Sequence, residues 1–477
     1  MKRCLCLFLL IVSGCKAGPD FVRPALPQAN QYSLPHAGAD SAAATTAESD
    51  TTQHIMLGEG VAMKWWTLFR SEELDVLVQE AIDGSPTILE ATSTLAQAQE
   101  LARAAAGALY PQIDATGGIG RQKYGKEFLG PLTAPPPFSY LAGGLAVNYS
   151  FDNTGGIARS IEERGALLEY QRQELRAAHL ALSGDVVAAA IGIAGAREQI
   201  RAVNDLLVED RRNLQLVQAS FDAGNATRVD VLVAESQLAN DETLLPPASQ
   251  ELSVRGHALA ALVGRGPGEW APPQFDLSQL TLPGTLPVSL PSELVRQRPD
   301  ILAAEAELHA ATAAVGVATA NLYPHITLTG TAGQQALTMN SLFDARNAVW
   351  SLTSGLTAPL FDGGSLRAKR HAQVDAMQAS AASYREAVLQ SLRQVADVLE
   401  GIDHDALLFT AETHAVNAAQ ASLNLARESY RAGNVGVLQV LDAERLYQRA
   451  RLDFVRVQTR RYLDTAQLFL ALGGTEP

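Results

Sequence analysis

The sequence predicts a fold that combines long α-helices with membrane β-strands, in two tandem copies of one helix, two-strand and long coiled-coil-helix unit. Three observations lead to this prediction. Apolar residues recur at every seventh position over a proline-free stretch, a matching stretch lies 209 residues earlier, and segments of alternating apolar residues precede both. Heptad spacing indicates a coiled-coil helix, and alternation indicates a strand. Because the same order occurs twice, we interpret the chain as an internal duplication.

The heptad stretch in the second half of the chain ends at Tyr430. Reading backwards, its positions are Leu423, Val416, Phe409, Ile402, Val395 and Val388. No proline lies between Gly364 and Arg431, so one helix here would be about 100 Å long at about 1.5 Å per residue. The matching earlier positions are Val186, Ile193, Ile200, Leu207, Leu214 and Phe221, and only His179 departs from the pattern.

Shorter motifs repeat in the same order on both sides of these helices. Leu109–Ile113 returns as Leu322–Ile326, Phe151-Asp152 as Phe361-Asp362, and Ala223-Gly224-Asn225 as Ala432-Gly433-Asn434. We therefore expect a first repeat over residues 65–263, a proline-rich crossover linker over 264–291 and a second repeat over 292–473. The expected strands are about 110–124, 138–152, 323–336 and 347–361, and the expected long helices about 155–223, 227–263, 364–432 and 436–472.

The N-terminus has the pattern of a secretory signal over residues 1–14. Lys2 and Arg3 precede a short apolar run that is too short to span a membrane as a helix. Val12-Ser13-Gly14-Cys15 resembles a bacterial lipobox, which implies acylation, including palmitate, at Cys15 and sorting to the outer membrane because Lys16 follows. Residues 15–64 are expected to form an extended, lipidated segment. No later segment has 18 consecutive apolar residues, so we expect membrane crossing by strands rather than by helices.

The expected strands have one apolar face and one face of hydroxyl or glycine residues. In the last strand Trp350, Leu352 and Leu356 alternate with Ser351 and Thr353. A half-buried sheet in a soluble domain remains an alternative, since alternation does not distinguish lipid from a protein core. Strands of about ten residues suit a membrane barrel, but the smallest single-chain barrels have about eight strands. Four strands per chain therefore predict a barrel shared by several chains.

Composition and spacing give no sign of chemistry on the chain. Lys plus Arg number 37 against 51 Asp plus Glu, for a net charge of −14, and there is no basic cluster of the kind that nucleic-acid binding needs. The nine histidines are scattered without metal-ligand spacing. We therefore expect no enzyme activity, cofactor, metal or nucleic-acid partner.

Several motifs together resemble the TolC-like outer-membrane efflux proteins, in their lipoprotein (NodT- and OprM-like) branch. These motifs are Cys15–Pro24, Trp65-Trp66, Arg298–Ile301, both Tyr-Pro sites, Phe361–Gly364 and the two Ala-Gly-Asn turns. The resemblance spans residues 15–473. It implies a homotrimer with a twelve-stranded barrel in the outer membrane and a helical barrel across the periplasm. It also implies an exit duct for small molecules that works with an inner-membrane transporter and a periplasmic adaptor. The duct would be anchored in the lipid of the outer membrane at Cys15.

The same resemblance implies where the functional residues lie. The closed end of the tunnel would be at the helical tips, where Asp442 matches one acidic position of the aperture and Gln439 stands at the other. The tips, Ala223-Gly224-Asn225 and Ala432-Gly433-Asn434, would dock the adaptor, and Asp230 would tie helices together with Arg228 or Arg431. Two alternatives remain open: a duct for type I protein secretion, and a non-conducting lipoprotein scaffold that spans the periplasm.

Overall fold

The computed structural model describes residues 16–25, 31–32, 53–124 and 136–474, so the expected signal and Cys15 lie outside the described residues. The chain forms two compact units, each built from distant segments. The first comprises residues 1–24, 93–172 and 303–385, and the second comprises 25–92, 173–302 and 386–477. Neither unit coincides with one of the repeats expected from the sequence. The reason is that each half of the chain contributes two strands of a four-stranded sheet to the first unit and the greater part of its long helices to the second.

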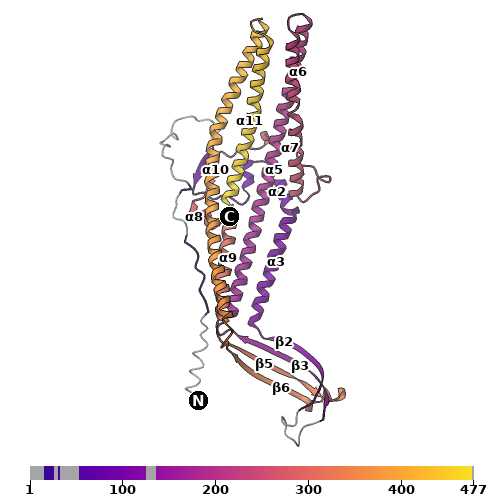
Figure 1. The fold of residues 1–477 in the computed structure, drawn as a ribbon, viewed down its shortest axis with the longest axis vertical. Coiled ribbons are helices and arrows are strands. Elements are labelled where there is room, and N and C mark those ends of the chain that lie inside the picture. The colour runs from indigo at the N-terminus through magenta and orange to yellow at the C-terminus, as the bar shows by residue number, and fades with distance from the viewer. Residues whose placement is uncertain (1–15, 26–30, 33–52, 125–135, 475–477) are drawn as a thin grey trace. The chain divides into compact units, whose positions relative to one another are not determined.

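The first unit contains an antiparallel sheet in the order β2-β3-β5-β6 (Figure 1). Its strands are β2 (Gln112–Gln122), β3 (Phe138–Phe151), β5 (His325–Ala336) and β6 (Ala348–Thr357). Leu145 pairs with Ala115 on one side and with Ala332 on the other, and Ala332 pairs with Trp350. Since paired residues share a face, the alternating apolar residues of all four strands lie on one face of the sheet.

The opposite face of the sheet is polar. Thr331 Oγ1 lies 2.7 Å from Ser351 Oγ, and Thr329 Oγ1 donates to Asn148 Oδ1 at 3.3 Å. Strand β6 ends at Thr357 rather than near residue 361, because Pro359 has no N–H to donate to a neighbouring strand.

Two helices of 67 residues each, α5 (Gly156–Asp222) and α10 (Ser365–Arg431), follow the paired Phe-Asp motifs. The Asp152 carboxylate accepts hydrogen bonds from the backbone N–H groups of Ile157 and Ala158 at 2.9 and 2.8 Å. Asp362 accepts equivalent bonds from Gly364 and Leu366. An acidic side chain is favourable at a helix N-terminus, where free N–H groups need acceptors. Each Phe-Asp motif therefore sets the start of a long helix.

The returning helix of the first half is broken, which corrects the expectation of one helix over about 227–263. Helix α6 (Arg228–Glu242) ends before α7 (Leu245–Leu262) begins. Pro246 and Pro247 lack the N–H groups that would continue the helix, and their rings clash with the carbonyls four residues earlier. The second half has no proline there, and α11 (Val437–Leu472) is continuous.

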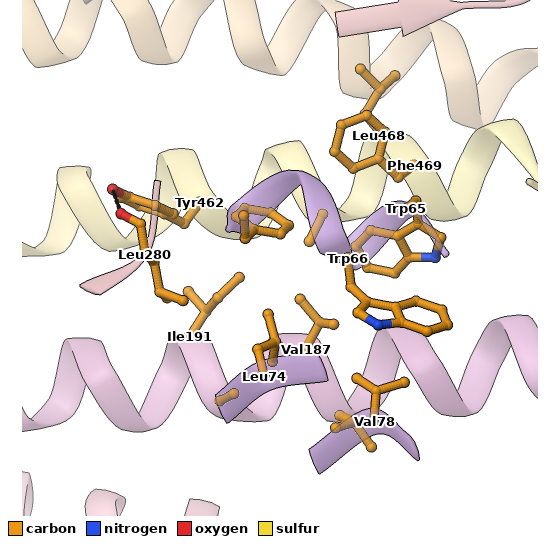
Figure 2. Close-up of a cluster of buried hydrophobic side chains, with 14 of the residues drawn as sticks. Trp65, Trp66, Leu74, Val78, Val187, Ile191, Leu280, Tyr462, Leu468 and Phe469 are labelled. Atoms are coloured by element: carbon orange, nitrogen blue, oxygen red, sulfur yellow. Dashed lines mark hydrogen bonds between the residues drawn. The ribbon is translucent and has the colours of Figure 1, made fainter. Parts of the chain in front are cut away.

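The second unit has an aromatic core (Figure 2). The short helix η2 (Trp65–Phe69) buries both tryptophans, and Trp65 lies 5.7 Å from Phe469 of α11, measured between ring centroids. The Tyr462 hydroxyl donates to the Leu280 carbonyl at 3.0 Å. The tandem tryptophans are thus packing anchors. The same core cluster includes residues of α2 (Glu72–Gly84), α8 (Pro291–Gln297) and the start of α3 (Pro86–Ala106), as well as of α5, α7 and α10. Helix α9 (Pro299–Ala320) follows α8 in the chain.

A small parallel sheet, which the sequence did not predict, joins the N-terminal segment to the crossover linker. Strand β1 (His54–Leu57) pairs with β4 (Thr285–Val288), with His54 opposite Thr285. The sequence predicts an extended segment over 15–64 and a crossover linker over 264–291, with no strand in either. Neither strand is long enough to show a clear alternation, so a partner more than 200 residues away defines the strands.

Among the described residues, α5 and α9 each contain an 18-residue window that is long and apolar enough to cross a membrane. Within these windows 56% of residues in α5 and 50% in α9 are buried inside the chain. In α5 the window includes Val187 and Ile191, which belong to the aromatic core of the second unit. Composition of this kind is also that of a buried core helix.

Candidate functional site

The tips of the second unit are two tight turns that connect α5 to α6 and α10 to α11 (Figure 1). In the first tip, the Gly224 N–H donates to the Phe221 carbonyl and the Asn225 N–H to the Ser220 carbonyl. In the second, Gly433 and Asn434 make the same pair of bonds to the carbonyls of Tyr430 and Ser429. Both glycines have positive φ angles, 76° and 74°. These are Schellman turns, in which a left-handed glycine satisfies the last carbonyls of the helix.

The two tips contact each other through polar and apolar side chains. Ser220 Oγ of α5 lies 3.2 Å from Tyr430 Oη of α10. Leu441 of α11 packs with Val217 of α5 and Val231 of α6 in a small buried cluster. The buried cluster at the tips is much smaller than the aromatic core, so less packing holds the helix ends together there.

The first tip has a helix cap that the second lacks. Thr227 Oγ1 accepts from the Asp230 N–H at 3.3 Å, and the Asp230 carboxylate accepts from the Thr227 N–H at 2.7 Å. This is a capping box, and the hydrogen bond from the Thr227 N–H lowers the pKa of Asp230. At the matching positions 209 residues later stand Gly436, which has no side chain to cap α11, and Gln439.

The structure gives Asp230 a capping role, and a tie between helices through this residue stays a prediction. The Asp230 carboxylate accepts hydrogen bonds from the Thr227 N–H and hydroxyl at the start of its own helix. Among the described residues it forms no ion pair with Arg228 or Arg431. In the sequence, a threonine at 227 is followed three residues later by the acidic Asp230. This spacing is that of a capping box, so it predicts the cap.

Asp442 and Gln439 lie one turn apart on the exposed face of α11. Asp442 Oδ1 accepts a hydrogen bond from Arg445 Nη2 at 2.8 Å, and both side chains are 61% exposed. The structure therefore adds a cation beside the predicted acidic position. The exposed turn residues Ala223, Gly224, Asn225, Ala432, Gly433 and Asn434 lie at the two tips, together with exposed Arg228 and Arg431.

Next to the tips, a partly buried ionic network joins three helices. Arg427 of α10 donates through Nη2 to Glu209 of α5 and to Glu444 of α11, at 2.7 Å in each case. The Glu444 side chain is only 3% exposed, and it also accepts from Gln448 Nε2 at 3.0 Å. A buried carboxylate needs such compensation, because removing a charge from water is costly.

A second buried acid, Asp210, lies next to this network and is 5% exposed. The pKa of Asp210 is raised to about 7. The largest cause is burial, the next is the hydrogen bond with Asp241, and the charges of Glu444 and Glu209 add to the effect. The sequence analysis missed this network. One signal was present, since Asp210 lies three residues after Leu207 and so falls on the apolar stripe of the helix.

We expect Asp210→Asn to remove part of the pH dependence of unfolding. The folded-state pKa of about 7 lies above the ordinary value of 3.8, so the folded chain holds a proton that the unfolded chain releases between these values. This contribution to stability is complete below about pH 4 and is lost as the pH rises through about 7. From about pH 5 to about pH 8, the wild-type Tm should therefore fall more than the variant Tm. Circular dichroism melting curves measure this difference.

The control for Asp210→Asn is Asp222→Asn, which changes an exposed carboxylate on the same helix. Its melting curves should follow the pH dependence of the wild type. Parallel pH profiles for wild type and Asp210→Asn would show that Asp210 does not hold a proton in the folded state.

Among the described residues, no group of three or more His, Cys, Asp or Glu side chains is arranged to hold a metal ion. The described residues that come together at the tips are those of turns, caps and ion pairs.

Comparison with known proteins gives consistent results over nearly the whole chain. The profile of the outer membrane efflux protein family matches residues 77–265 and 290–474. Outer membrane protein OprJ of Pseudomonas aeruginosa is 29% identical, over 98% of this chain and 94% of OprJ. The pyoverdine export outer membrane protein OpmQ of the same organism is 31% identical, over 86% and 87%. The structure of the outer-membrane channel OprN superimposes with a TM-score of 0.86 at 26% identity, over 96% of this chain and 99% of OprN.

The fold is thus that of the helix-rich, TolC-like outer-membrane channels. The chain belongs to the outer membrane efflux protein family, and it is an outer-membrane channel for efflux.

Proposed function

We propose that three copies of the chain share one twelve-stranded barrel in the outer membrane and one helical tunnel in the periplasm. The open sheet of the first unit supports this proposal. Within the described part of the chain, β2 and β6 each pair with one neighbour only, so both edges of the sheet have free N–H and C=O groups. Lipid cannot satisfy such groups, and pairing β6 of one copy with β2 of the next would.

The observation that carries the proposal is the exposed apolar face of this sheet. Trp350 and Leu356 are 79% and 70% exposed, although both lie on the face that gathers the apolar residues of all four strands. A sheet in a soluble domain would bury this face against a core. An apolar outer face with a hydroxyl-rich inner face is typical of a water-filled membrane barrel.

We further propose that the channel is the passive exit duct of a tripartite system with an inner-membrane transporter and a periplasmic adaptor. The adaptor would dock at Ala223-Gly224-Asn225 and Ala432-Gly433-Asn434, with Arg228 and Arg431 beside them. These residues are exposed in the single chain, as a docking surface requires. The chain itself would supply no catalysis. Acylation at Cys15, supported by the lipobox-like sequence, would anchor each copy in the outer membrane.

Two experiments test the proposed function. Purified protein in a planar lipid bilayer should give stable conductance steps, whereas a scaffold would give none. A deletion strain should become hypersensitive to a subset of antibiotics, dyes, detergents or metal ions, and complementation should restore resistance. Unchanged susceptibility together with a protein missing from the culture medium would favour the secretion duct instead.

Asp442→Ala is expected to lower the cation selectivity of the conducting channel by roughly two-fold. The reason is that Asp442 would place one carboxylate per copy around the narrow end of the tunnel, partly compensated by Arg445. Removing the carboxylate leaves an uncompensated arginine, which repels cations. Reversal potentials in a salt gradient measure the change.

Two further variants make the selectivity test specific. Arg445→Ala should shift selectivity in the opposite direction, because Asp442 then lacks its partner. Asp453→Ala, about three turns further along α11, should leave selectivity unchanged. If Asp442→Ala and Asp453→Ala behave alike, Asp442 and its neighbour Gln439 do not line the aperture.

A further inference from the structure

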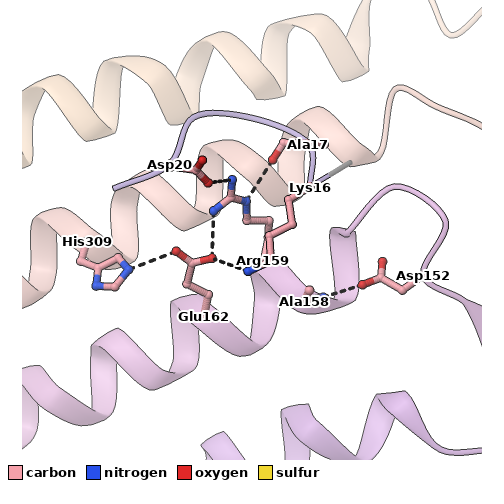
Figure 3. Close-up of polar contacts among 8 residues, drawn as sticks. All are labelled: Lys16, Ala17, Asp20, Asp152, Ala158, Arg159, Glu162 and His309. Carbon is pink, nitrogen blue, oxygen red and sulfur yellow. Dashed lines mark hydrogen bonds and ion pairs between the residues drawn. The ribbon is translucent and has the colours of Figure 1, made fainter. Parts of the chain in front are cut away.

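The residues that follow Lys16 are bound tightly to the start of α5 (Figure 3). We call residues 17–23 the N-terminal strap. The Ala17 N–H donates to the Thr154 carbonyl at 2.9 Å, and the Ala17 carbonyl accepts from Arg159 Nε at 3.0 Å. Both polar groups of this backbone unit are therefore satisfied by residues at the junction between β3 and α5.

Arg159 is the centre of this contact and is 1% exposed. Its Nη2 donates to Asp20 Oδ1 at 2.6 Å and its Nη1 to Glu162 Oε2 at 2.9 Å. Two of the three acceptors of the guanidinium, the Ala17 carbonyl and Asp20, belong to the strap. Without the strap, Arg159 would keep only Glu162 as a partner, so the bound strap supplies two of the three acceptors of a buried guanidinium, one of them the exposed carboxylate of Asp20.

The strap approaches α9 so closely that only glycine fits at the contact. Gly18 has a φ angle of 81°, and a Cβ atom there would lie 2.5 Å from Gly316 Cα. A Cβ on Gly316 would lie 2.7 Å from Arg159 Cγ and 2.9 Å from the Ala17 carbonyl oxygen. Glycine on the strap, Gly18, and glycine on α9, Gly316, therefore allow the strap and the helix to approach this closely.

The far end of the strap is held along α9. The Phe21 ring stacks on His309 with centroids 4.4 Å apart, and His309 Nε2 lies 3.1 Å from Glu162 Oε1. Arg23 Nε donates to Glu305 Oε1 at 2.7 Å. Fixing seven residues in one conformation costs conformational entropy, and this series of contacts along the whole strap offsets that cost.

We propose that Arg159 and the two glycines form a docking site for the chain's own strap, and that this site positions the acylated residue 15 at the β3–α5 junction. The proposal rests on the acylation of Cys15 proposed above. Ala17 lies two positions after Cys15, with only Lys16 between them, so the two Cα atoms are at most about 7 Å apart. The acyl chains must therefore enter lipid close to Thr154, where the strand ends and the helix begins. Arg159 is a positioning residue that sets the lipid anchor and the sheet at the same depth.

The test uses the endoproteinase Lys-C, which cleaves after lysine, on the full-length protein in detergent. In the wild type the Lys16–Ala17 bond is protected, because Ala17 is hydrogen-bonded on both sides. In Arg159→Met the strap should open, and a new N-terminus at Ala17 should appear at least about ten-fold faster in mass spectra, since proteolysis follows the population of the open form. Arg164→Met, which changes an exposed arginine on the same helix, should be cleaved at the wild-type rate.

Gly316→Ala provides an independent variant, since it displaces the strap without changing any charge, and it should also accelerate cleavage. Circular dichroism checks that both variants are folded. Equal cleavage rates in wild type, folded Arg159→Met and folded Gly316→Ala would overturn the docking site. The mass of residues 15–16 released from Arg159→Met reports acylation separately: an unmodified fragment, together with a wild type that resists cleavage, would overturn the lipid anchor but leave the docking site standing.

Discussion

Replacing Arg427 by methionine is expected to destabilise the protein by about 3 kcal/mol, at the lower end of the cost of breaking a buried ion pair. The guanidinium is the cation that contacts both Glu209 and the buried Glu444. Without it, these two carboxylates and Asp210 lie close together with little compensation. Arg427 is itself partly exposed, so water that enters will limit the loss. Thermal unfolding of the purified protein measures the effect.

A matched control for Arg427 is Arg393→Met on the same helix. Arg393 and its partner Asp397 are both exposed, and such a pair contributes about 1 kcal/mol or less. Adding Glu444→Gln to Arg427→Met should recover part of the lost stability, because it removes the buried charge. A melting temperature for Arg427→Met equal to that of Arg393→Met would show that the network does not hold the three helices together.

Gly264→Ala is expected to have a second large effect on stability. Gly264 closes α7 in a Schellman turn with a φ angle of 77°, and its N–H donates to the Ala261 carbonyl at 3.0 Å. A Cβ atom there would overlap the carbonyl oxygen of Gly84 at the end of α2. Backbone cannot move aside as a side chain can, so we expect a loss of about 3 kcal/mol or more.

Gly224→Ala is the control that separates the two causes. Gly224 has nearly the same φ angle, but a Cβ atom there meets no other atom within 4 Å. It should therefore cost only the left-handed conformation, about 1 kcal/mol. If both substitutions lower the melting temperature equally, the close approach of Gly264 to Gly84 does not contribute to stability.

The parts of the fold that local patterns encode could be predicted from the sequence. Period-two alternation around Trp350 and Leu145 placed the strands, and the register in the sheet puts those residues on one apolar face. Glycine after the long helices predicted the turns at Gly224 and Gly433, whose φ angles only glycine adopts readily. The missed break at Pro246 is also local, and its signal was present in the printed sequence.

The parts that depend on distant partners could not be predicted. Nothing near His54 indicates that it pairs with Thr285, because a four-residue strand is defined by its neighbour. Arg427, Glu209 and Glu444 are ordinary polar residues on helical surfaces until three helices pack together. Whether Asp442 and Gln439 line an aperture depends on other copies of the chain, so their role stays a prediction.

The unequal caps of the two tips have a consequence for local unfolding. The first turn of α6 is held by the reciprocal bonds of Thr227 and Asp230, whereas α11 starts at Gly436 with no side chain to satisfy its first N–H groups. The amide hydrogens of residues 437–440 should therefore exchange with solvent faster than those of residues 228–231. A force applied equally to the α5–α6 hairpin and to the α10–α11 hairpin would then unwind the α10–α11 hairpin first. Unfolding would begin at the N-terminal end of α11, while the hairpin of α5 and α6 stays folded.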